Sequence, residues 1–138
     1  MSLPWPYYIL VDREVRPASD AQEWVGWFET HRDRHVAETF IGEYRVSTIF
    51  LATDFNFSGT GLPVLFESLV QWPNPEHVNA SDGVTGGFEG FLYYRTQYHT
   101  YDQAEQGHEA LCEQIRRLTE NGGRVTVEIL SALKLSNE

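Results

Sequence analysis

Residues 45–51 read Arg-Val-Ser-Thr-Ile-Phe-Leu, and this stretch is the strongest β-strand signal in the chain. It begins with alternating polar and apolar side chains and ends with three apolar ones, which is typical of a strand inside a sheet. Other β-rich runs lie on both sides of it, at residues 7–15, 37–41, 62–72, 88–98 and 125–129. The domain is therefore expected to be organised around a sheet.

Two segments carry the start signals and the periodicity of amphipathic helices. Ser19 and Gln22 form a capping-box pattern before an aromatic helical stripe, and Thr100 and Gln103 form another. The second helix should bury one stripe and expose another: Ala104, His108, Leu111, Ile115 and Leu118 against Glu105, Glu109 and Glu113. We predict an α+β fold with an antiparallel or mixed β-sheet of about five to six strands and two amphipathic helices packed on one face.

Composition limits both the size and the partners of the protein. The chain has 138 residues with 20 acidic and 10 basic side chains, which gives a net charge of −10. The length suits a single domain over residues 1–138. The negative charge argues against direct nucleic-acid binding and against a polybasic membrane anchor, and no apolar run approaches the roughly 20 residues of a membrane-spanning helix. The single cysteine, Cys112, predicts a cytoplasmic location.

Four blocks of the sequence carry a family resemblance: residues 24–29, 45–54, 62–70 and 98–108. In order and spacing they resemble an uncharacterised family of small proteins found in bacteriophages and prophages, over about residues 20 to 116. Phe55 stands where the family often has histidine, and the segment 73–87 is longer than in the family. The resemblance implies a phage or prophage origin and no particular activity.

One candidate site combines two carboxylates and a histidine. Asp54 ends one predicted strand, Glu67 lies within the next, and His108 is expected to point at the sheet. If the strands pair, the three residues could form a metal-assisted hydrolase site. The same residues are also explained by a turn cap, an ion pair with Arg45 and a hydrogen-bonded core histidine. No established catalytic spacing is present, so the hydrolase is the alternative hypothesis.

Other reactive residue types give weaker signals. His31 and His35 have the i, i+4 spacing of a zinc-binding pair on a helix. Arg32 and Arg34 would repel a cation there, so a solvated helix end is the better interpretation. Cys112 falls among acidic neighbours that do not favour a thiolate, which indicates a packing role. We predict no metal ion and no cofactor.

Aromatic residues are more numerous than one small sheet obviously needs. In the run 88–98, one trio of side chains alternates with the trio Leu92, Tyr94 and Thr96. The expected partner-binding or ligand-binding residues are Trp72, Phe91, Tyr93, Arg95 and Tyr98. One of the two trios is predicted to point outward, either Phe91, Tyr93 and Arg95 or its alternating counterpart. We expect the outward trio to be covered either by a loop of the chain, such as residues 73–87, or by a partner.

The leading hypothesis is a non-enzymatic accessory protein of the phage or prophage type. It would bind a host protein or a small signalling molecule, with host takeover or anti-defence as its role. One alternative is the metal-assisted hydrolase described above, and a second is a virion or structural component. A homodimer is the simplest way to cover an exposed row of rings, because a two-fold interface buries the same patch twice.

Overall fold

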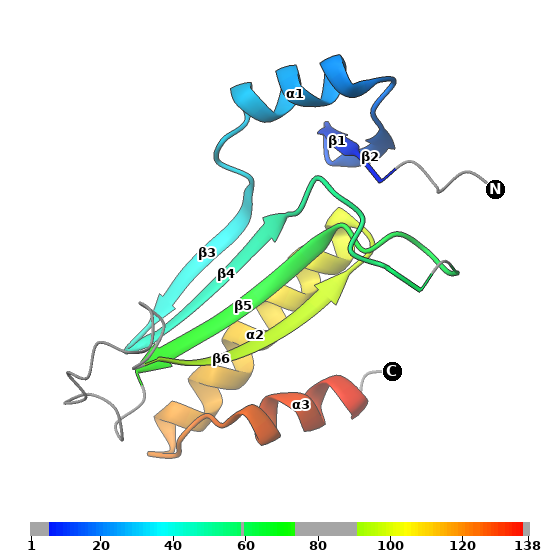
Figure 1. Cartoon of the computed structure of the whole chain (residues 1–138). Coiled ribbons are helices and arrows are strands. Elements are labelled where there is room, and N and C mark those ends of the chain that lie inside the picture. The colour runs from blue at the N-terminus through cyan, green and yellow to red at the C-terminus, as the bar shows by residue number, and fades with distance from the viewer. Residues whose placement is uncertain (1–5, 59, 74–90, 137–138) are drawn as a thin grey trace, which may run out of the picture.

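The computed structural model describes residues 6–58, 60–73 and 91–136. Strands β3, β4, β5 and β6 form a four-stranded antiparallel sheet in sequence order, and β1 and β2 form a separate two-stranded hairpin (Figure 1). The elements are β1 (Tyr8–Val11), β2 (Glu14–Pro17), α1 (Ala21–Thr30), β3 (His35–Ile41), β4 (Tyr44–Phe50), β5 (Phe66–Pro73), β6 (Phe91–Tyr98), α2 (Tyr101–Glu120) and α3 (Val127–Ser136). All but the first residue of the predicted loop 73–87 lies outside the described residues.

The α+β class is confirmed, but the main sheet has four strands instead of about five to six. The run 7–15 does not join it as one strand, because it turns back on itself. Asp12 and Arg13 have φ values of 51° and 69°, the left-handed backbone that a tight two-residue hairpin requires. Such turns usually contain glycine or asparagine, and the absence of both here hides the turn in the sequence.

The strand predicted over residues 125–129 is wrong, because the chain forms helix α3 from Val127. The Ile129 amide donates to Thr126 Oγ1 over 3.2 Å, so the threonine side chain satisfies an amide of the first turn. Leu130 is fully buried and packs in the same core cluster as Val125. Alternation over five residues is too short to exclude a helix, and burial of Leu130 favours one.

Helix α2 lies across one face of the four-stranded sheet (Figure 1), which we call the inner face. Leu130 of α3 joins the core cluster that contains Trp72, Tyr94 and Ile115, so α3 also contributes to this side. The predicted pair of helices on one face is therefore matched only in part, since the second helix there is α3.

Helix α1 packs with the β1–β2 hairpin at one end of the sheet (Figure 1). The Trp24 indole donates to the Ala52 carbonyl over 2.9 Å, and the Trp27 indole donates to the Leu10 carbonyl over 3.2 Å. The helix begins one residue later than predicted, because Asp20 is its N-cap and accepts from the Glu23 amide. Aromatic side chains of α1 therefore close the end of the core instead of covering the sheet.

Helix α2 has the predicted orientation. Its buried residues are Ala104, His108, Leu111, Cys112 and Ile115, while Glu105, Glu109 and Glu113 are exposed. Leu118, which was also predicted to be buried, is only half-buried against the core. The capping box of Thr100 and Gln103 is complete, since each side chain accepts a backbone hydrogen bond from the other end of the motif. Local sequence signals and packing agree for this helix.

Thr100→Ala is expected to lower the free energy of unfolding by about 1 kcal/mol, because it leaves the Gln103 amide without its capping oxygen. Urea denaturation measures the loss. Glu109→Ala, on the exposed side of the same helix, should change stability by less than about 0.5 kcal/mol. Equal losses for the two variants would contradict the assigned cap.

Candidate functional site

The face of the sheet opposite α2, called the outer face, is built from alternate residues of all four strands. Figure 1 shows no helix lying across this face among the described elements. The strand register arranges its side chains in three rows across the sheet: Phe40, Arg45, Gln71 and Tyr93; Glu38, Ser47, Leu69 and Arg95; and His35, Ile49, Glu67 and Gln97.

Charges on the outer face are paired. The Arg45 guanidinium donates to Glu38, and this hydrogen bond lowers the pKa of the Glu38 carboxyl. The Arg95 Nε atom lies 3.4 Å from Glu67 Oε1, which also accepts from Gln97 over 3.3 Å. Two acidic and two basic side chains therefore give these rows a net charge of zero.

Apolar side chains lie between these charges. Phe40 is 67% exposed at the β3 edge. Ile49 and Leu69 occupy the two central strands and are half-buried, and Tyr93 follows on β6. A contiguous surface with aromatic, aliphatic and arginine side chains has the composition of a protein-binding surface.

The predicted binding residues do not all share this surface. Tyr93 and Arg95 belong to the outer face, and Phe91 has the same register phase, opposite Pro73, although its side chain is outside the described part. Trp72 is only 4% exposed and lies in the core below the inner face. Tyr98 also points inward, where its hydroxyl donates to Ser68 over 3.0 Å.

The three residues of the hydrolase alternative lie apart. Asp54 caps a loop, since its Oδ1 accepts from the amides of Asn56 and Val64 over 2.7 and 2.9 Å. Glu67 lies on the outer face, whereas His108 belongs to α2 and is buried between that helix and the inner face. No group of three His, Cys, Asp or Glu residues could hold a metal ion within the described ranges.

His108 belongs to a buried polar layer. Its Nδ1 lies 2.7 Å from Thr48 Oγ1, and its Nε2 lies 2.9 Å from Thr39 Oγ1. Thr48 is hydrogen-bonded to Ser68, which accepts from Tyr98. Burial lowers the pKa of His108, so the imidazole is neutral, with one nitrogen donating and the other accepting.

The polar layer divides the interior into two apolar clusters. Val46, Val70 and Ile115 belong to the first cluster, and Phe50 and Phe66 to the second. Within the described residues, every buried side-chain nitrogen and oxygen atom has a hydrogen-bond partner. The layer therefore fixes the register of α2 on the sheet, because any other register would leave these polar groups unpaired.

Cys112 lies next to this layer in α2. It is 1% exposed, and burial raises the pKa of its thiol. A thiol that is both buried and protonated is a poor nucleophile. The packing role predicted for this residue agrees with its position.

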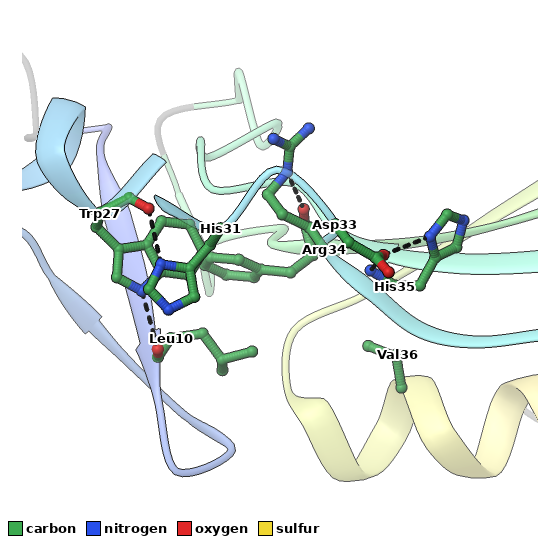
Figure 2. A pocket seen from close by; sticks show the side chains of 8 residues that line it. Leu10, Trp27, His31, Asp33, Arg34, His35 and Val36 are labelled. Carbon is green, nitrogen blue, oxygen red and sulfur yellow. Dashed lines mark hydrogen bonds and ion pairs between the residues drawn. The ribbon is translucent and has the colours of Figure 1, made fainter. Parts of the chain in front are cut away.

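His31 and His35 do not form a helical pair. Helix α1 ends at Thr30, so His31 is its C-cap and His35 begins β3. Figure 2 shows the His31 ring lying against Trp27, with ring centroids 4.5 Å apart, while His35 interacts with Asp33. The two histidines therefore lie on different parts of one small cleft.

The volume of this cleft is about 110 Å³, and its lining consists of Leu10, Trp27, His31, Asp33, Arg34, His35, Val36 and Phe50 (Figure 2). Sites for organic ligands usually measure about 300–1,000 Å³. The cleft has room for a few water molecules, so the outer face is the stronger candidate for a binding surface.

Several outer-face residues escaped the sequence analysis. The run 37–41 was interpreted only as a short strand, so Glu38 and Phe40 were not assigned to a face. Their alternation with Thr39 was the available signal, but only the register shows that they share a surface with Arg95. Gly107 also carried a signal, as a glycine inside a helix usually has a packing reason.

None of the described helices is both long and apolar enough to cross a membrane. Comparisons with protein-family models, with curated proteins and with solved structures found no match to this chain.

Proposed function

We propose that this chain is a non-enzymatic binding protein that holds a protein partner on its outer sheet face. The observation that carries the proposal is the outer face itself, in which apolar side chains lie between paired charges across four strands. Its mixture of aromatic, aliphatic and arginine side chains suits a protein better than a small signalling molecule. The resemblance to phage and prophage proteins supports an accessory role and makes a host protein one class of partner.

The contacts of the three residues in the hydrolase alternative support binding over catalysis. Glu67 is held by Arg95 and Gln97, and Asp54 is held by two backbone amides. His108 is enclosed by two threonine hydroxyls. Each residue of the hydrolase alternative therefore has a structural role where it lies.

Phe40→Glu is expected to abolish partner capture, because it places a charge in the apolar part of the outer face. The tagged full chain is used to capture proteins from a bacterial lysate to which the untagged chain has been added, and each captured protein, including the untagged chain, is quantified by mass spectrometry. Phe57→Glu is the matched control, since Phe57 is 84% exposed in a loop away from the strands. The proposal fails if Phe40→Glu captures the same proteins, in the same amounts, as the unchanged chain.

A further inference from the structure

We infer that the partner on the outer face is a second copy of this chain, in a two-fold dimer with the two sheets packed face to face. This inference rests on the proposed function, because it uses the same surface. It is carried by the placement of charge on that surface. The register of the four strands fixes where the four charged residues lie within the rows.

Net charge favours this face for self-association. The whole chain carries −10, while Glu38 and Glu67 are balanced by Arg45 and Arg95 within the rows. Among the described residues, the other acidic side chains therefore lie outside these rows, where two copies repel each other. Contact through the neutral outer face keeps those side chains furthest from each other.

The order of charges across the sheet is also self-complementary. A two-fold axis parallel to the strands places β3 of one copy over β6 of the other and keeps each row opposite the same row. Glu38 then faces Arg95 of the second copy, and by symmetry this pair occurs twice. In the first row, the exposed Phe40 ring comes opposite the Tyr93 position, which suits an aromatic contact.

The other in-plane orientation is unfavourable. A two-fold axis perpendicular to the strands places each strand over its own copy, so the second row faces itself in the same order. Glu38 would then oppose Glu38, and Arg95 would oppose Arg95. Like charges in contact cost free energy, so the pattern selects the axis parallel to the strands.

The size of the surface sets the expected strength of the dimer. Strands of 7 to 8 residues in a four-stranded sheet cover roughly 19 by 23 Å. This projected area of roughly 440 Å² is below the ~800 Å² per partner of a standard interface. We therefore expect a dissociation constant in the micromolar range, and face-to-face packing with the strands about 30° apart.

Charge reversal in the full chain tests the inference. Analytical ultracentrifugation from about 5 to about 500 µM should show a concentration-dependent dimer. Glu38→Arg and Arg95→Glu should each weaken it by about tenfold or more, since each change creates two repulsive contacts. The double variant should recover the unchanged affinity to within about threefold, and an equimolar mixture of the two single variants should form a heterodimer.

Recovery in the double variant reports contact between copies. Glu38 and Arg95 lie three strands apart within one chain, about 14 Å, which exceeds the screening length of about 8 Å at physiological salt. Glu109→Arg and Arg124→Glu make the same changes in net charge at exposed positions outside the rows. These controls should leave the dissociation constant within about twofold of its starting value.

Three results would overturn the inference: a monomer over the whole concentration range, single reversals without effect, or no recovery in the double variant. The capture experiment separates this failure from failure of the proposed function. If the chain is a monomer and Phe40→Glu no longer captures the host proteins, the outer face binds another protein and not a second copy. If the chain is a monomer and Phe40→Glu captures the same proteins as the unchanged chain, both proposals are contradicted.

Discussion

His108→Ala is expected to lower the free energy of unfolding by about 3–5 kcal/mol, because it removes a buried side chain and breaks two buried hydrogen bonds. His108 is 1% exposed, and both ring nitrogens are hydrogen-bonded, to Thr39 and to Thr48. Urea denaturation at neutral pH measures the loss. His35→Ala is the control, since that histidine lies at the surface, and its cost should stay below about 1 kcal/mol.

The same residue makes the fold sensitive to acid. Burial lowers the pKa of His108 in the folded state, a smaller effect of Glu109 opposes the shift, and Arg116 adds to it. Between this lowered pKa and the unfolded value of about 6.5, the unfolded chain binds more protons than the folded chain. The free energy of unfolding contributed by His108 is therefore complete above about pH 6.5 and falls as the pH decreases.

His108→Asn isolates this contribution, because asparagine keeps a hydrogen-bonding group without a titrating ring. The stability difference between the unchanged chain and His108→Asn should shrink as the pH falls from about 7 to about 5. Equilibrium urea unfolding across that range gives the difference at each pH. A difference that stays constant would show that His108 does not couple protonation to folding.

Local signals in the sequence predicted α2 well. The capping box at Thr100 and the apolar stripe through Leu111 are both set by neighbouring residues, and the structure confirms both. The hairpin turn at Asp12 and Arg13 contains neither glycine nor asparagine, so no local pattern predicted it. The helix from Val127 depends on burial of Leu130 against distant strands, which no local pattern contains.

Which residues of a strand face the helices also depends on contacts between distant segments of the chain. Alternation correctly separated Tyr93 and Arg95 from Tyr94, but both sets contain aromatic rings, so the sequence could not decide which set faces α2. The buried hydroxyls of Thr48 and Ser68 meet only through the pairing of β4 with β5. Polar residues inside apolar strands become interpretable when their cross-strand neighbours are known.

Gly107→Ala is expected to lower the free energy of unfolding by about 2–4 kcal/mol, although alanine usually stabilises a helix interior relative to glycine. A Cβ atom at this position would overlap the ring of Tyr98. The ring cannot simply move away, because its hydroxyl donates to the fully buried Ser68. Glycine in α2 therefore lets the helix approach the sheet closely enough for His108 to reach Thr48.

A matched glycine and a second-site change make this explanation testable by urea denaturation. Gly26→Ala in α1 meets no atom within 4 Å and should raise stability by about 0.5–1 kcal/mol. Tyr98→Ala removes the overlapping ring, so combining it with Gly107→Ala should cost clearly less than the sum of the two single changes. Tyr98→Phe keeps the ring but removes the hydroxyl that holds it to Ser68, so it should give a partial rescue that is smaller than that of Tyr98→Ala. If Gly107→Ala is as stable as the unchanged chain, the close contact of Tyr98 with α2 does not constrain the fold.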